Sequence, residues 1–147
     1  MYRAAGVVPL SKNTTQTTVA SGSAVTLTTS ATSYNVTSIS LAAGTWLVWG
    51  VVDFSESSAT VTLEQAGISA TTATLPTQAG GSGVGPDPLS TQVMATSAAT
   101  QTDQLHIGPT IVTLAATTTI YLVANATFSA GSMSAYGTLT TMKINLA

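Results

Sequence analysis

The sequence contains no cysteine, a single histidine and very few charged side chains. The lack of cysteine excludes disulfide bonds and thiolate metal sites. With His106 alone, one chain cannot supply a histidine pair to a metal or a second histidine to a catalytic relay. Three basic and five acidic residues give a formal net charge of -2, which offers no basic surface to a phosphate backbone. We therefore expect no enzymatic activity and no nucleic-acid partner.

Long apolar runs are also missing. The longest run, 46–52, is far shorter than the roughly 20 residues that a membrane-spanning helix requires. At the N-terminus, Arg3 precedes only a brief apolar patch over residues 4–10, which does not match a signal peptide. No helical period of 3.6 residues continues for two turns. The sequence thus predicts no membrane partner and no α-helix.

Abundant Thr, Ser, Ala and Val dominate the 147 residues. Thr and Val favour strands, while Lys and Glu, which are depleted in strands, are rare in this chain. The length fits one domain with a substantial core. Because small soluble proteins stay dispersed partly through surface charge, a chain with so few charges is expected to associate with itself. The composition indicates an all-β domain that self-assembles.

The stretch 41–54 concentrates more large apolar surface than any other part of the chain, and it is typical of a strand covered on both faces. A second stretch, 114–128, repeats its Leu-Ala-Ala opening and closing Phe. Internal duplication and similar selection by burial both explain the likeness. We assign one face of the two strands to the core, namely Trp46, Val48, Val52, Ile120, Leu122 and Phe128.

The opposite faces of these two strands need a partner, since one sandwich has only one core to fill. That reasoning predicts a homotrimer. Its interface candidates are Leu47, Trp49, Val51, Tyr121 and Val123.

Shorter alternating patterns predict the remaining strands, which are joined by Gly, Ser, Pro and Asn turns. Residues 34–54 are expected to form a hairpin, and Pro109 suggests an edge strand or a strand start. Residues 76–88 are expected to form a long exposed loop. The pattern predicts an antiparallel β-sandwich with jelly-roll connections over residues 21–147, preceded by an extended N-terminal arm over residues 1–20. Further strands are expected near 25–28, 61–65, 89–96, 107–114 and 133–146.

Several motifs of this sequence resemble a domain of tailed-bacteriophage virion proteins, found at fibre tips and in small decoration or head-fibre proteins. They are the segments 41–46, 66–69, 73–76, 114–124, 128–131 and 135–137. The resemblance extends over roughly residues 20 to 145 and implies a trimeric jelly roll of the tumour-necrosis-factor kind. One departure is the segment 141–144, where related chains are often more basic.

The resemblance implies a structural role in a virion. Because the chain begins at Met1 and only about twenty arm residues precede the domain, we expect a capsid cement or decoration protein rather than a fibre tip with a shaft. Its partners would be its own copies and the major capsid protein, and its location the capsid surface. The alternative is a tail-fibre or head-fibre tip that recognises a host-surface receptor, a glycan or a protein.

Two segments are candidates for contacts with such partners. Residues of the 76–88 loop are expected to touch a partner, and residues of the arm are expected to clasp the shell or a neighbouring subunit. The loop candidates are Gly80, Gly81, Ser82, Gly83, Val84 and Asp87. The arm candidates are Tyr2, Arg3, Val7, Val8 and Leu10.

Acidic residues offer the remaining candidates for chemistry. Asp53, Glu56 and Glu64 lie near one turn and could offer oxygens to Ca²⁺, but we favour a solvated strand end. Asp103 is most simply a surface charge. For His106 we likewise favour a solvated or hydrogen-bonded ring over a ligand shared across a threefold axis. The sequence therefore predicts no metal site and no cofactor.

Overall fold

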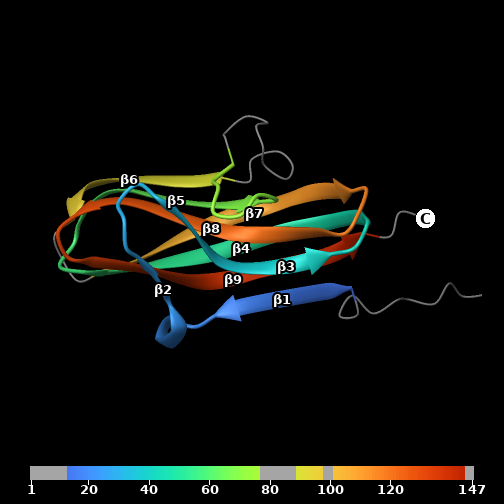
Figure 1. Ribbon diagram of the computed structural model, residues 1–147, viewed down its shortest axis with the longest axis horizontal. Coiled ribbons are helices and arrows are strands. Elements are labelled where there is room, and N and C mark those ends of the chain that lie inside the picture. Colours follow the sequence, from blue (N-terminus) through green and yellow to red (C-terminus); the bar gives the residue numbers. More distant parts are fainter. Residues whose placement is uncertain (1–12, 77–88, 98–100, 145–147) are drawn as a thin grey trace, which may run out of the picture.

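The computed structural model describes residues 13–76, 89–97 and 101–144, which form nine strands and one short 3₁₀ turn, Ser21–Ser23 (Figure 1). The described part of the chain contains no α-helix, as the sequence predicts. The strands are β1 Thr14–Val19, β2 Val25–Leu27, β3 Ser33–Leu41, β4 Gly44–Ser57, β5 Thr60–Ser69, β6 Leu89–Ser97, β7 Thr102–Leu114, β8 Thr118–Ser129 and β9 Ser132–Ile144.

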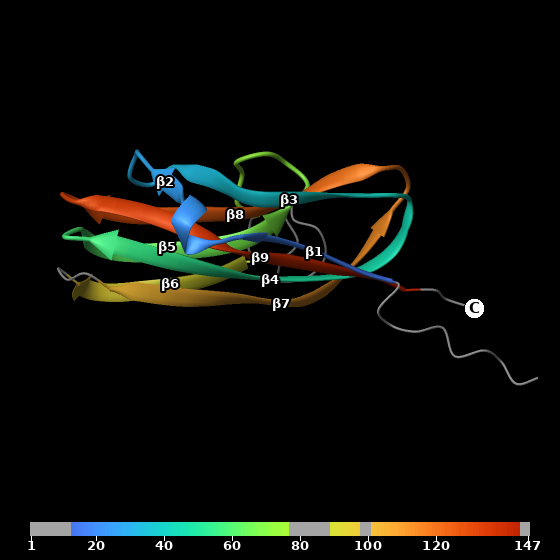
Figure 2. The ribbon, with the colours of Figure 1, turned by 90° about the horizontal axis from the view of Figure 1, so that it is seen from below.

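The strands form two antiparallel sheets that pack face to face, which confirms the predicted β-sandwich (Figure 2). One sheet has the order β1-β9-β4-β7, with β2 also paired to β9, and the other has the order β3-β8-β5-β6. The pairing is nested: β1 pairs with β9, β3 with β8, β4 with β7 and β5 with β6. The chain is thus one long hairpin rolled into two layers, which is the jelly-roll arrangement.

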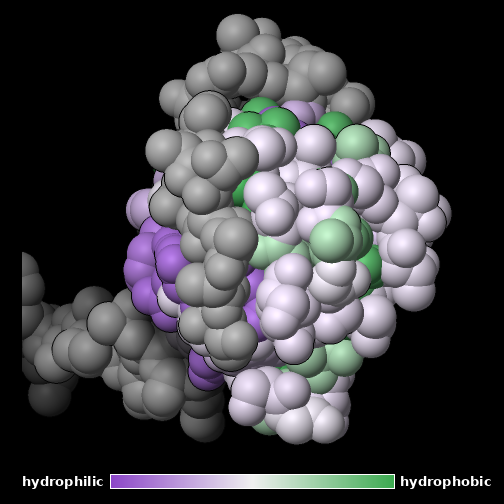
Figure 3. Space-filling model, turned by 90° about the vertical axis from the view of Figure 1, so that its left-hand side faces the viewer, coloured by the Kyte–Doolittle hydropathy of each residue, from purple (hydrophilic) through white to green (hydrophobic). Residues whose placement is uncertain are grey.

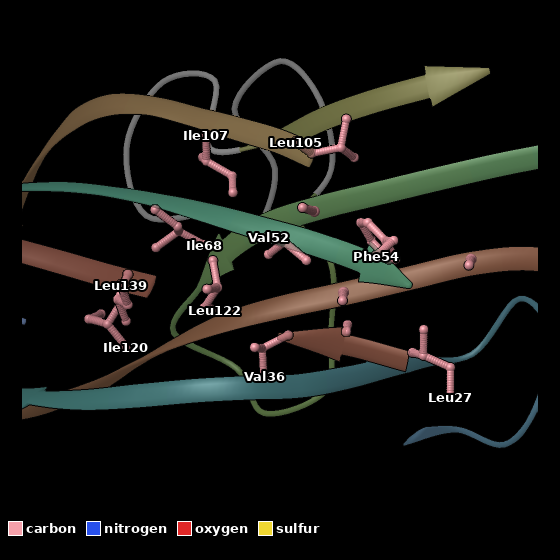
Figure 4. Packing of buried hydrophobic residues seen from close by; sticks show 14 of the residues in the cluster. Leu27, Val36, Val52, Phe54, Ile68, Leu105, Ile107, Ile120, Leu122 and Leu139 are labelled. Carbon is pink, nitrogen blue, oxygen red and sulfur yellow. The ribbon is translucent and has the colours of Figure 1, made fainter. Parts of the chain in front are cut away.

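Inward-facing apolar side chains from both sheets fill the space between the layers (Figure 4). Val52 and Phe54 of β4, Leu122 of β8 and Ile68 of β5 all lie in this space, and each of these side chains is fully buried. The predicted core members Val48, Val52, Ile120 and Leu122 are fully buried, whereas Trp46 and Phe128 are partly buried against the edge of the core. Period-two alternation therefore identified the inward face of both long strands.

Strands β4 and β8, which carry the two similar stretches, occupy equivalent positions. Each lies in the interior of its sheet, β4 between β9 and β7 and β8 between β3 and β5. Gly50 in the middle of β4 has a packing reason, because a Cβ there would lie 2.9 Å from Leu122 Cδ1 of the opposite sheet. The absence of a side chain at Gly50 leaves room for the end of the Leu122 side chain in the core.

Pro109 lies within β7, at the edge of its sheet. Between the paired positions Val48–Thr110 and Gly50–Ile107, two residues of β7 face one residue of β4, which defines a β-bulge. A proline at this position removes no necessary ladder hydrogen bond. The edge position expected from Pro109 is confirmed.

Two sequence expectations need correction. Residues 34–54 do not form a hairpin, because β3 and β4 lie in different sheets and the two-residue link between them crosses the sandwich. Residues 14–19 of the expected arm form β1, an ordinary strand of the first sheet. The strand was missed because its largely exposed Thr and Gln side chains give no apolar alternation. Residues 1–12 lie outside the described residues.

Candidate functional site

The predicted interface residues are divided between the two outer faces of the sandwich. Leu47, Trp49 and Val51 point outward from β4 in the first sheet, whereas Tyr121 and Val123 point outward from β8 in the second sheet. One flat contact therefore cannot include both sets. The sequence identified the outward direction of these side chains but not that the two strands belong to opposite layers.

The outer face of the first sheet carries a half-buried apolar strip along β4. In the strand register, Leu47 lies between Ile111 of β7 and Met142 of β9, and Val51 lies between His106 and Thr138. Ile111 is 57% exposed and is the one large hydrophobic residue of the described chain that is exposed. Threonines surround this strip on β9 and β1, where the Oγ1 atoms of Thr18 and Thr138 lie 3.1 Å apart. We call residues 47, 49, 51, 111 and 142 the β4 strip.

The outer face of the second sheet is partly covered by the chain itself. Val123 is fully buried, so it has no surface left for a partner, while Tyr121 is half-buried. Asn35, directly opposite Val123, donates to Thr72 Oγ1 at 2.6 Å and accepts from the Ala73 amide at 2.7 Å. These bonds hold the segment after β5 back against β3. Sequence reasoning attached no role to Asn35.

Three carboxylates converge between the sheets at the end where β4 turns into β5. Glu56 continues the inward-facing row of β4, Asp103 that of β7, and Glu64 that of β5 in the opposite sheet. One oxygen from each can be chosen so that all three lie within 4.8 Å of one another. Glu56 and Glu64 are 1% and 0% exposed, and Asp103 is half-buried. We call this group the carboxylate cluster.

The two glutamates of the carboxylate cluster are buried without hydrogen bonds to their carboxylate oxygens. None of their four carboxylate oxygens has a hydrogen-bond partner. Burial raises the pKa of Glu64 to about 8, and the charges of Asp103 and Glu56 act in the same direction. Burial, and then the charge of Asp103, also raises the pKa of Glu56. Asp103 itself accepts a hydrogen bond from Gln101 Nε2 at 2.6 Å.

These positions correct the expectation for the acidic residues. Glu56 and Glu64 are not at a solvated strand end, and Asp103 is not a simple surface charge. Asp53 lies outside the cluster, because it faces the opposite side of β4 and accepts a hydrogen bond from Gln104 at 2.7 Å. The sequence indicated that Glu56 points inward, because it follows Val52 and Phe54 at a spacing of two residues. It did not indicate that β4 pairs with β7, which brings Asp103 to the same place.

Figure 3 looks onto the end of the sandwich where the cluster lies beneath the turns. The described surface there is mostly pale, meaning that its residues have intermediate hydropathy, with scattered hydrophobic areas in green and a hydrophilic area at the left in purple. The turn residues Ser57, Ser58 and 129–132 are exposed.

The remaining candidates are placed as follows. His106 is exposed on the outer face of β7, opposite Val51. Lys143 lies over the ring of Trp46, 5.7 Å from its centroid, and the Trp46 indole donates to the Ala42 carbonyl at 3.0 Å. The loop candidates at 80–84 and 87, and the arm candidates at 2–10, lie outside the described residues. No helix in the described ranges is long and apolar enough to cross a membrane.

Comparison with known proteins supports the fold alone. No family model matches the sequence, and no curated protein matches it. Among solved structures, a chain in the structure of infectious bursal disease virus, Gx strain, is similar, with a TM-score of 0.51 and 16% identity. The match covers 97% of this chain and 36% of the viral chain, so this chain spans about a third of the length of that neighbour. The jelly roll described above is therefore a fold that also occurs in a virus chain.

Proposed function

We propose that this protein is a non-enzymatic structural component of a virion. The observation that carries the proposal is the nested jelly-roll pairing over nearly the whole chain, which has a counterpart in a chain of a virus structure. Fold alone does not determine function. The chemistry of the surface adds to the argument, because the described outer faces present Thr, Ser and apolar side chains rather than a catalytic constellation.

The finer proposal is a homotrimeric decoration protein on a bacteriophage head, seated beside the major capsid protein. The β4 strip supplies an apolar surface for this contact, since Leu47, Trp49 and Val51 are only half-buried in one chain and would gain burial against other copies. Around a threefold axis, three copies of one sheet face can meet, and this arrangement uses Leu47, Trp49 and Val51 without requiring Tyr121. The proposed interface is therefore narrower than the sequence suggested.

The alternative is a receptor-binding tip, in which the same trimer displays a loop to a host glycan or protein. Strands β5 and β6 form the innermost pair of the rolled hairpin, and the loop predicted over residues 76–88 falls between them in the sequence, largely outside the described residues. Loops of that length are often functional. This reading requires specific recognition, whereas decoration requires only contact with the shell.

Copy number and location on purified particles test the proposal. Quantitative mass spectrometry of separated heads and tails should find the protein in many copies with heads if it decorates the capsid. A few copies that fractionate with tails, together with inhibition of adsorption by the purified protein, would support the receptor-binding tip instead. Absence of the protein from particles would contradict both virion roles.

A further inference from the structure

The carboxylate cluster joins the two layers of the sandwich at one end. Glu56 and Asp103 come from neighbouring strands of the first sheet, and Glu64 comes from the second sheet. Their selected oxygens lie within 4.8 Å of one another. A single ion placed between them would contact both sheets at once. This geometry differs from a surface cluster of acids, in which the side chains diverge into water.

Burial is the second observation that points to a ligand. Glu56 and Glu64 are almost completely removed from solvent, and none of their carboxylate oxygens has a hydrogen-bond partner. Buried charges in proteins are normally paired or coordinate a metal ion. Lys143 is the one Lys or Arg among the described residues. Its register partner, Trp46, lies ten positions before Glu56 along β4, which corresponds to roughly 33 Å. No described basic side chain therefore neutralises the cluster.

We propose that Glu56, Glu64 and Asp103 bind one Ca²⁺ ion that clamps the two sheets together. Three carboxylates form an all-oxygen, strongly anionic ligand set, which suits a hard cation. Ca²⁺ lies about 2.3–2.6 Å from its oxygen ligands, so oxygens up to 4.8 Å apart can contact the same ion. Mg²⁺ requires shorter distances and near-ideal octahedral geometry, so it fits this set less well. The site is independent of the proposed virion role.

Protons compete with the ion for the same oxygens. Because the raised pKa of Glu64, about 8, keeps this carboxyl protonated at neutral pH, Ca²⁺ must displace that proton. Apparent Ca²⁺ affinity should therefore increase as the pH rises from 6 toward about 8, with proton release on binding. A cluster that holds only protons would not show this coupling to Ca²⁺.

The test uses the full chain, stripped with a chelator and then dialysed at about pH 8, near the pKa of Glu64. Calorimetric titration with CaCl₂ should give one ion per chain. At a CaCl₂ concentration about 100 times the dissociation constant, the Tm should rise by roughly 5–10 °C. MgCl₂ should give a clearly smaller shift. No CaCl₂ binding and no Tm shift would overturn the proposal, because the cluster would then hold protons alone.

Two variants make the result specific. Glu64→Gln removes a ligand and a buried charge together, so it should stay folded without metal and lose at least about tenfold in Ca²⁺ affinity. Asp53→Asn is the matched control, since Asp53 lies on β4, the strand that carries the ligand Glu56, but faces away from the cluster. It should bind Ca²⁺ like the unmodified chain. Equal Ca²⁺ responses in both variants would contradict the assigned ligands and indicate a general ionic effect.

Discussion

The inward faces of the sandwich divide into an apolar centre and an acidic end, and both contain fully buried side chains. Val52 and Phe54 of β4 meet apolar side chains from β5 and β8, whereas Glu56, the next inward residue, meets Glu64 and Asp103. The apolar centre stabilises the fold by removing hydrocarbon from water. The acidic end opposes folding unless a proton or a cation neutralises it. Burial alone therefore does not tell which side chains stabilise this protein.

The largest effect is expected from opening the apolar centre. Leu122→Ala removes a fully buried side chain that packs between the central strands, so it should lower the free energy of unfolding by about 2–5 kcal/mol. Urea denaturation followed by tryptophan fluorescence measures this change. Ser40→Ala, at an exposed position on β3, is the control and should change stability by less than about 0.5 kcal/mol. If Leu122→Ala lowered the free energy of unfolding only slightly, the apolar centre would be poorly packed.

A substitution in the acidic end should have the opposite sign. In metal-free protein at about pH 8, Glu64→Gln removes a buried group that is partly charged, and it should raise the free energy of unfolding by roughly 1–4 kcal/mol. The same urea experiment in chelator measures it. Destabilisation by this neutral, nearly isosteric side chain would mean that the carboxylate makes a stabilising contact in the folded chain.

Metal-free stability should also depend on pH through Glu64. Its pKa is raised in the folded chain, from 4.5 to about 8, so the folded state holds more protons than the unfolded state between these values. Stability is then greatest below about pH 4.5 and falls as the pH rises to about 8, with a slope of up to about 1.4 kcal/mol per pH unit. Denaturation across this range should show the decrease, and Glu64→Gln should flatten it. A rise in stability over the same range would contradict the raised pKa.

A smaller effect is expected at Asp103, which contributes less than burial to the raised pKa of both glutamates. Asp103→Asn should lower the pKa of Glu64 toward its usual range and narrow the pH window over which metal-free stability falls. The expected change in stability at neutral pH is on the order of 1 kcal/mol. Unfolding curves of the variant at several pH values would detect the narrower window, and an unchanged window would show that burial acts alone.

The sequence predicted the residues of the apolar centre, but it did not predict the carboxylate cluster. Period-two alternation identified Val48, Val52, Ile120 and Leu122 as core, because side-chain direction follows directly from strand geometry. It did not predict which strands become neighbours. Asp103 is far from Glu56 in sequence and meets it only because β7 pairs with β4. The cluster therefore depends on long-range pairing that a local pattern does not encode.

The outer faces show the same limit. The outward direction of Trp49 and Tyr121 was predicted correctly, but their strands lie in different sheets, so the two residues face opposite sides. Val123 was expected at an interface and is instead buried within its own chain, on the face where Asn35 holds the segment after β5. Such a covering segment has no periodicity that would reveal its position.

The central claim, self-assembly through the β4 strip, is tested most directly by the mass of the protein in solution. Light scattering after size-exclusion chromatography should give three times the chain mass of 14.7 kDa at micromolar concentration. Trp49→Asp should shift it to the single-chain mass, because a charge in the strip cannot be buried against another copy. Ser40→Asp, on the outer face of the other sheet, should remain trimeric. A stable monomer of the unmodified chain, or an unchanged trimer of Trp49→Asp, would contradict the account.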